Sequence, residues 1–393
     1  MINLLSVYIF TILIQIPVVG GLFQGSSVGT NLYAAIDIIF FIIVIIIYST
    51  KFEKSISNSD TLKSIYAFII YAFISMLWSV SLNLEYGAQL LLRDFIRVTS
   101  IAIMASNVCQ NQFRKKLSKV IVFSSIAYLI LSILTMSYGY DFKGSDGRLM
   151  YSGYKDANPI ARDIGLLTII YYWLFKNKDI KNNNKNLILL FLLGVAFLAV
   201  FSKTTVIAFI FAIYFSYFHR KLKVKNFIKM AMGICTLIII LIYFRGDYLT
   251  QYLTNVQGGN ALSTLSGRTD IWNVAFRYLI DNFLFGHGIN SFSNYSSRIL
   301  NNAPAQVHNE IINIIFSYGV VGLILVSRIY LKYYNEANKS EDQSIKILIK
   351  SLVIFYLIVG FTEANIVTTI APLWIFTLFA IYATRSTRKA ERF

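Results

Sequence analysis

Charged residues are scarce in this 393-residue chain, and their scarcity excludes a single soluble globular domain. Asp, Glu, Lys and Arg together make up 14% of the sequence, whereas 56% is hydrophobic and the mean hydropathy is +0.61. The hydrophobic residues form repeated runs close to the roughly 20 residues that span a bilayer. The chain is therefore predicted to be an all-α polytopic membrane protein.

Cysteine and histidine are also rare, with two and three residues. Cys109 and Cys235 lie in or beside predicted helices, far from the outer loops, so no structural disulfide is expected. The histidines are scattered and no His/carboxylate cluster has the spacing of a metal site, so neither a metal nor another cofactor is expected. The first apolar run has no basic leader and no small-residue cleavage site, so no cleavable signal peptide is expected.

Twelve apolar segments are predicted as membrane helices of one integral membrane domain, residues 1–393. The seventh and eighth are short and are separated only by Ser202, Lys203 and Thr204, which also fits broken or re-entrant segments. The approximate ranges are 2–19, 32–49, 64–80, 87–108, 116–137, 158–176, 186–201, 204–218, 227–244, 308–330, 344–361 and 364–384.

Basic residues recur in every second loop, and the positive-inside rule assigns these loops to the cytoplasm. Both termini are then cytoplasmic, and the longest loop, residues 245–307, lies outside. The formal net charge of +17 mostly reflects this topology, so no nucleic-acid partner is expected.

Arginine is over-represented among the basic residues on the predicted outer side. Eight Arg and three Lys lie there or in the outer leaflet, whereas the cytoplasmic side holds 19 Lys and six Arg. A guanidinium binds phosphate through two parallel hydrogen bonds and stays charged in a partly dry site, so this side is predicted to bind a phosphorylated or acidic ligand. Salt bridges with nearby aspartates are the alternative. The candidate ligand-binding residues are Arg93, Arg97, Arg148, Arg162, Lys203 and Arg268.

Arg93 and Arg97 are the least expected of these residues, because they lie one turn apart and about 10 Å inside the fourth predicted helix. Ionisable groups at such depth usually face a protein interior or a wet cavity. Asp94 can neutralise only one of them. Arg162 could pair with charges on neighbouring helices, and Lys203 could extend its amine to the membrane interface.

The long outer loop contains a predicted amphipathic helix near residues 269–283. Its apolar residues form one stripe and its polar residues another, which is typical of a helix lying on the membrane surface. Arg268 immediately precedes this helix. Its side chain and the exposed N–H groups of the helix start could together hold an anion.

A histidine stands where this loop returns to an apolar helix. His308 and Asn309 are followed after nine residues by Gly319, and Gly322 comes three residues later. In a continuous helix, His308 and Gly319 would share a face about 16 Å apart, which would place a titratable group above a glycine-lined groove. The alternative is a histidine that caps the helix and glycines that let neighbouring helices pack closely.

These patterns resemble the O-antigen polymerase and O-antigen ligase superfamily of bacterial envelope polysaccharide assembly. The number of helices, their orientation and the long outer loop between the ninth and tenth spans agree with it. Most members carry Arg where this chain has Lys203. The motifs that carry the resemblance are Arg268, Trp272, Phe285-Gly286-His287-Gly288, His308-Asn309-x9-Gly319-x-x-Gly322, Gly147-Arg148, Asn158-Pro159 and Ser202-Lys203.

The resemblance implies a helical bundle of the GT-C glycosyltransferase class, with the outer loop partly covering a cavity open to lipid. The donor would be a glycan on undecaprenyl diphosphate, since no nucleotide sugars are expected outside the membrane. Arginines would hold the diphosphate and stabilise its developing charge, while neutral His308 removes a proton from the acceptor hydroxyl. His287 is a second candidate for this base, and Glu310 or Glu363 could orient His308. The expected supporting residues are Asn158, Asn309, Gly319, Gly322 and Glu363.

Three functions remain open. A polymerase would transfer the growing glycan to the non-reducing end of a new lipid-linked repeat unit, and a ligase would transfer the finished glycan to lipid A-core. A composition rich in residues with AT-rich codons favours the polymerase, whereas the His-Asn-to-glycine spacing is similar to that of ligases. A transporter of polysaccharide or lipid-linked sugar is disfavoured because no two-half repeat is evident.

The polymerase hypothesis also predicts partners and a location. The partners are lipid-linked oligosaccharide donor and acceptor, membrane lipid, and as further candidates a chain-length regulator and a flippase. The location is the bacterial cytoplasmic (inner) membrane, with the active site on the periplasmic side.

Overall fold

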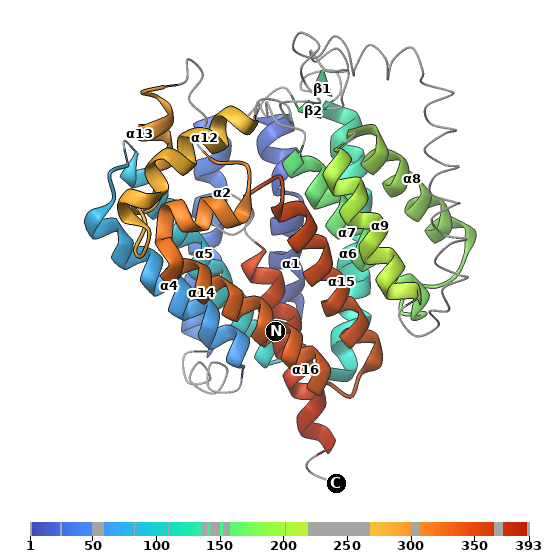
Figure 1. Cartoon of the computed structure of the whole chain (residues 1–393). Helices are drawn as coiled ribbons and strands as arrows, with labels where there is room; N and C mark the ends of the chain where they lie inside the picture. Colours follow the sequence, from blue (N-terminus) through green and yellow to red (C-terminus); the bar gives the residue numbers. More distant parts are fainter. Residues whose placement is uncertain are drawn as a thin grey trace.

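The structure, a computed structural model, is a bundle of helices (Figure 1). It describes residues 2–23, 26–48, 59–81, 83–108, 110–135, 140–141, 150–151, 158–200, 202–218, 268–299, 306–364 and 372–390. The prediction of an all-α polytopic membrane protein is confirmed. In the described part, two-residue strands β1 (Tyr140–Asp141) and β2 (Met150–Tyr151) form one antiparallel pair.

The helices follow the predicted order closely. The first part of the chain forms α1 (Ile2–Leu13), η1 (Pro17–Leu22), α2 (Ser27–Tyr48), α4 (Asp60–Ile74), η3 (Ser75–Trp78), α5 (Leu84–Ser106), α6 (Gln110–Thr135), α7 (Asn158–Lys176), α8 (Asn184–Val200) and α9 (Lys203–Phe218). The second part forms α12 (Arg268–Leu279), η4 (Ile280–Asn282), α13 (Phe292–Ser296), α14 (Glu310–Lys339), α15 (Gln343–Gly360) and α16 (Leu373–Ala390). The predicted helix 227–244 and residues 245–267 lie outside the described residues.

Five described segments are long and apolar enough to cross a bilayer. These are Ser27–Tyr48, Asp60–Trp78, Gln112–Leu134, Glu310–Lys339 and Gln343–Gly360. Four further apolar helices of the described part are shorter, namely Leu4–Leu13, Asn184–Val200, Lys203–Phe215 and Leu373–Arg385.

The start of the last helix was predicted incorrectly. The apolar run suggests a start near residue 364, but α16 begins at Leu373. Pro372 has no N–H to contribute to a helix interior, and its carbonyl accepts the first helical hydrogen bonds from Ile375 N at 3.0 Å and Phe376 N at 3.1 Å. Glu363 and Ala364 are therefore outside any helix.

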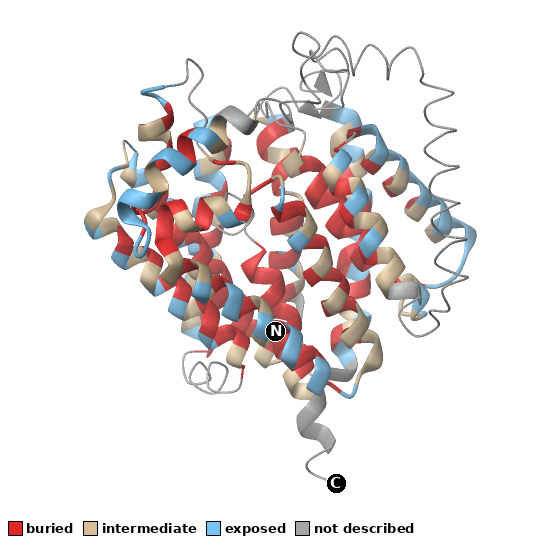
Figure 2. Ribbon diagram, in the orientation of Figure 1, coloured by how far each residue is buried: buried red, intermediate tan, exposed pale blue. Residues whose placement is uncertain are grey.

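Side chains fill the bundle where the helices face one another. α9 packs on α15, α4 on α14, α16 on α5, and α1 on α6. Buried residues concentrate along these contacts, whereas α8 presents many exposed apolar side chains (Figure 2). A second, smaller hydrophobic cluster lies under α12 and α13 and contains Val274, Ala275, Phe292, Val307 and Phe316. The segment that contains α12 and α13 thus has a core of its own, which includes Val307, the residue before His308.

A buried carboxylate attaches α14 to α4. Glu336 of α14 is 6% exposed. Its Oε1 accepts hydrogen bonds from Ser59 Oγ at 3.0 Å and Thr61 N at 3.1 Å, and its Oε2 accepts one from Thr61 Oγ1 at 2.7 Å. A carboxylate at a helix N-terminus satisfies N–H groups that have no partner within the helix and meets the positive end of the helix dipole. These contacts fix the ends of two long helices together.

α14 is not a continuous helix, and this corrects the face argument made from the sequence. Gly319 has φ 64° and ψ −167°, so the helix breaks there. The helix begins at Glu310, which leaves His308 outside it. His308 and Gly319 therefore do not share one helical face.

Candidate functional site

Four segments that are distant in sequence meet at the carboxylate of Glu363, just beyond the end of α15. Its Oε1 accepts a hydrogen bond from Asn158 Nδ2 at 2.6 Å, at the first residue of α7. The same oxygen is 2.8 Å from Arg268 Nη2, at the first residue of α12. Its Oε2 lies 3.3 Å from His308 Nδ1. Glu363 is 8% exposed, so these contacts form in a largely dry environment.

The backbone at His308 is held in an unusual conformation. Its φ of 52° lies in the left-handed region, which is uncommon for a residue with a side chain. Asn309 caps α14, because its Oδ1 accepts a hydrogen bond from Ile312 N at 3.0 Å while its Nδ2 donates to the carbonyl of Phe361 at 3.1 Å. Trp272 Nε1 donates to the carbonyl of Val307 at 3.0 Å. Hydrogen bonds thus fix the residues on both sides of His308. Strained backbone conformations that are held in this way often occur at functional sites.

The contact with Glu363 determines which nitrogen of His308 can act as a base. When Nδ1 donates a proton to a carboxylate, the neutral ring carries its lone pair on Nε2. The carboxylate also stabilises the imidazolium that forms when Nε2 takes up a proton. The His308 side chain is 30% exposed and that of Arg268 is 20% exposed, so both remain accessible at the surface of the protein. The arrangement is suited to general base catalysis beside a cation.

His287, the second candidate base, is 2% exposed and both its ring nitrogens have protein partners. Nε2 lies 2.8 Å from the carbonyl oxygen of Tyr278, and Nδ1 is 2.9 Å from Tyr295 Oη and 3.2 Å from Asn282 Nδ2. A ring that donates from Nε2 to the Tyr278 carbonyl and accepts at Nδ1, with the shorter contact from Tyr295 Oη, has a partner at each nitrogen. This geometry favours a structural role.

The glycines form a junction between backbones rather than a groove. His287 N and Gly288 N donate to the carbonyls of Phe316 and Ser317, at 2.8 and 2.9 Å. A Cβ on Gly286 would lie 2.5 Å from Gly319 N, and a Cβ on Gly319 would collide with the backbone of Leu284. The expectation of a glycine-lined groove above which His308 sits is therefore wrong. The glycines fasten residues 283–288 to the break in α14.

A comparison with known protein families bears on the resemblance drawn from the sequence motifs. A family model described as O-Antigen ligase matches residues 188–327. Over these residues the chain is similar to the O-antigen ligase family, which supports the resemblance drawn from the sequence motifs. No curated protein matches the chain. The matched segment includes Arg268 and His308, whereas Asn158 and Glu363 lie outside it.

Arg97, one of the residues predicted from the sequence to bind an anion, has partners inside the bundle. Its Nη2 lies 2.8 Å from Asp37 Oδ2, and its Nε donates to the same oxygen at 2.9 Å. Nη2 also donates to Gln15 Oε1 at 2.8 Å, and Tyr8 Oη donates to Asp37 Oδ1 at 2.9 Å. Arg97 is 1% exposed. This geometry favours the salt-bridge alternative for Arg97, with Asp37 of α2 as its partner.

The remaining predicted cations differ in their surroundings. Arg93 is 8% exposed, and its Nε and Nη2 make no hydrogen bond to a described residue. Arg162 and Asp163 are buried one turn beyond Asn158 on α7. Lys203 is exposed at the first residue of α9. Arg148 lies outside the described residues.

Of the predicted site residues, the structure thus brings together His308, Arg268, Asn158 and Glu363. Gly319 and Gly322 lie further along α14 and are buried. The sequence marks Glu363 only as a carboxylate that follows an apolar run, which does not indicate that it contacts His308. Its contact with His308 depends on how the ends of α7 and α15 meet.

Proposed function

We propose that this chain is a glycosyltransferase that extends a surface polysaccharide on the outer side of the bacterial cytoplasmic membrane. It would transfer a growing glycan from undecaprenyl diphosphate to the non-reducing end of a new lipid-linked repeat unit. The contact of His308 with Glu363, beside Arg268, carries this proposal. This contact places a base next to a cation at the ends of the helices of an apolar bundle.

The reaction follows from the roles of these groups. The acceptor hydroxyl attacks the anomeric carbon of the donor, and Nε2 of His308 takes the hydroxyl proton. The bond between this carbon and the diphosphate oxygen breaks, and the electron pair leaves with the undecaprenyl diphosphate. Arg268 stabilises the charge on that leaving group, and Glu363 keeps His308 and Arg268 in position. Lys203 and Arg93 are further candidates for holding the diphosphate.

A ligase is the second candidate, because the matching family carries that description. A ligase would use the same base and the same donor but would transfer the finished glycan to lipid A-core. The two reactions therefore differ in the acceptor. They are distinguished by supplying the purified chain with defined lipid-linked oligosaccharide, with and without lipid A-core.

His308→Ala tests the catalytic step in the same assay. Transfer should be lost while the protein remains folded in the membrane, because the acceptor hydroxyl loses its base. Arg277→Lys and Arg298→Lys serve as controls, since both arginines are exposed and lie over Tyr278 and Tyr295. Undiminished transfer by a stable His308→Ala protein would exclude His308 as the base. Absence of transfer to either acceptor by the wild-type chain would instead exclude the proposed function.

A further inference from the structure

An apolar crevice lies between α1 and α6, at the end of the bundle where α6 begins. Its lining includes Leu5, Ser6 and Ile9 of α1 and Phe113, Lys116 and Val120 of α6. All but Ser6 and Lys116 are hydrophobic. A lysine is therefore placed at the edge of an otherwise apolar cavity.

Lys116 is part of a cluster with Lys115 and Lys119. None of these three lysines forms an ion pair with a residue that the structure describes. Arg114 next to them differs, because it pairs with Asp179 and with Asp342, whose Oδ2 is 3.5 Å from Arg114 Nη1. Within the described part of the chain, no acidic residue thus neutralises the positive charge of this cluster.

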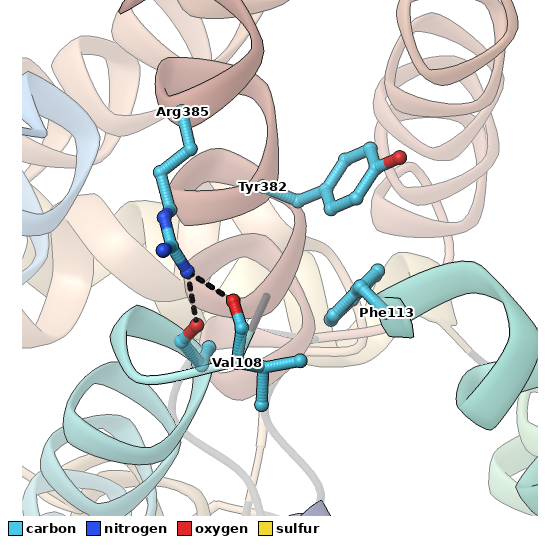
Figure 3. A pocket seen from close by; sticks show the side chains of 5 residues that line it. Val108, Phe113, Tyr382 and Arg385 are labelled. Carbon is cyan, nitrogen blue, oxygen red and sulfur yellow. Dashed lines mark hydrogen bonds between the residues drawn. The ribbon is translucent and has the colours of Figure 1, made fainter. Parts of the chain in front are cut away.

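A second cavity, which also has Phe113 in its lining, contains another basic residue, Arg385 (Figure 3). Arg385 of α16 lines this second cavity. Its Nη1 donates to the carbonyl oxygens of Ala105 and Val108, at the end of α5. Basic side chains commonly satisfy the last carbonyls of a helix in this way, so the guanidinium is already engaged.

The lysines lie in the first turns of a candidate membrane span. The apolar span of α6 covers Gln112–Leu134, so Lys115, Lys116 and Lys119 fall within its first turns. Leu117 and Val120 face the crevice. Around the axis of α6, Lys116 is less than a third of a turn from either of them. If Lys116 holds the anionic group of a lipid, the apolar chain of that lipid could therefore lie along the crevice.

The crevice is far from His308. α7 begins at Asn158, which contacts Glu363, and ends at Lys176, 19 residues later. Asp179, just beyond that end, binds Arg114 of α6. The crevice and the candidate active site are thus separated by the length of α7, roughly 27 Å. A donor lipid whose diphosphate reaches His308 does not have its headgroup at Lys116.

We propose that this crevice binds an anionic glycerophospholipid such as phosphatidylglycerol. The headgroup phosphate is held by Lys116 with Lys115 and Lys119, and part of an acyl chain lies along the open apolar face of the crevice formed by α1 and α6. Basic pockets between membrane helices bind anionic headgroups in this way, and the long lysine side chains reach the phosphate level. This site is independent of the proposed transferase function.

The proposal is tested with the purified full chain by native mass spectrometry and by crosslinking with a photoreactive phosphatidylglycerol. The wild type is compared with the double variant Lys116→Gln/Lys119→Gln, with Ser6→Trp, which fills the crevice from α1, and with Lys181→Gln/Lys185→Gln as a matched control. The control lysines are exposed; Lys181 precedes α8 and Lys185 is the second residue of α8. Phosphatidylethanolamine and undecaprenyl phosphate are used as competitors.

Each lysine near an anionic headgroup contributes about a fivefold gain in affinity, so the double variant should bind roughly 25-fold more weakly. Ser6→Trp should also lose binding, the control should not, and crosslinks should fall in residues 5–9 and 113–120. Equal binding by all variants, or equal binding of phosphatidylethanolamine, would overturn the proposal. Stronger competition by undecaprenyl phosphate would overturn it too, by making the crevice a polyprenyl site.

Discussion

Replacing Glu363 by glutamine tests whether this residue positions the base. Glu363→Gln keeps the size of the side chain but removes its charge. The amide oxygen can still accept a hydrogen bond from Asn158 or Arg268. The amide NH2 is a donor and cannot accept the hydrogen bond of His308 Nδ1, which is 3.3 Å from Glu363 Oε2 in the wild type. His308 then loses the partner that selects its tautomer and stabilises its protonated form.

General base catalysis contributes about 10²–10⁴-fold to a rate. Because Glu363 acts through His308 and does not itself remove the proton, we expect kcat to fall about 100-fold. KM for the acceptor should change little. A residue with a purely structural role would instead lower the amount of folded protein and leave kcat per folded molecule unchanged.

A double-mutant cycle measures this dependence. Transfer is assayed for Glu363→Gln, for His308→Gln and for the double variant, with Glu341→Gln as a control at an exposed glutamate. If the two residues act as one unit, the double variant is about as slow as His308→Gln alone. Effects that multiply would refute the positioning role, because Glu363 would then contribute without His308.

Four further outcomes follow from other parts of the structure. Glu336→Gln should lower the free energy of unfolding by about 1.5–3 kcal/mol, the usual loss for hydrogen bonds to a buried charge, with unchanged transfer per folded molecule in a thermal-stability and activity comparison. Arg97→Leu should destabilise the protein by about 3–5 kcal/mol because Asp37 is left buried and uncompensated; an active, stable variant with weaker donor binding would instead support the diphosphate role. Gly319→Ala should reduce the amount of folded protein, measured by size-exclusion chromatography in detergent, since its φ of 64° and the adjacent backbone leave no room for a Cβ. Transfer should persist in excess EDTA and with Lys203→Arg; activity that stops with EDTA and returns with magnesium would contradict the proposed metal-independent mechanism.

Much of the bundle could be predicted from the sequence, because apolar runs and turn residues mark where helices start and stop. The predicted sixth helix has the bounds of α7, residues 158–176. The break at Gly319 could not be predicted in the same way, since a single glycine in an apolar run is compatible with an unbroken helix. What decides its conformation is the packing of residues 283–288 against α14.

For the candidate site, too, the sequence identifies residues within one motif but not the contacts between distant segments. The motif around His308 identifies a base, but Glu363 is 55 residues away, and only the fold places it beside His308. On its own helix the sequence offers Asp94 as a partner for only one of Arg93 and Arg97, and it does not identify the partner of Arg97. That partner is Asp37, 60 residues earlier, because a guanidinium buried between helices is neutralised across the interface.

The pair formed by Asp37 and Arg97 also bears on how the chain is assembled during synthesis. α2 is the most apolar of the described spans, with a mean hydropathy of 2.5, so it can enter the bilayer while carrying an unpaired aspartate. α5 carries Arg93, Asp94 and Arg97 and is not among the described helices apolar enough to cross by composition alone. Each such charge near the centre of a helix opposes insertion by about 2.5–3.5 kcal/mol. Since α2 leaves the ribosome first, its aspartate is already present when α5 arrives, and the later helix is retained in the membrane by the earlier one.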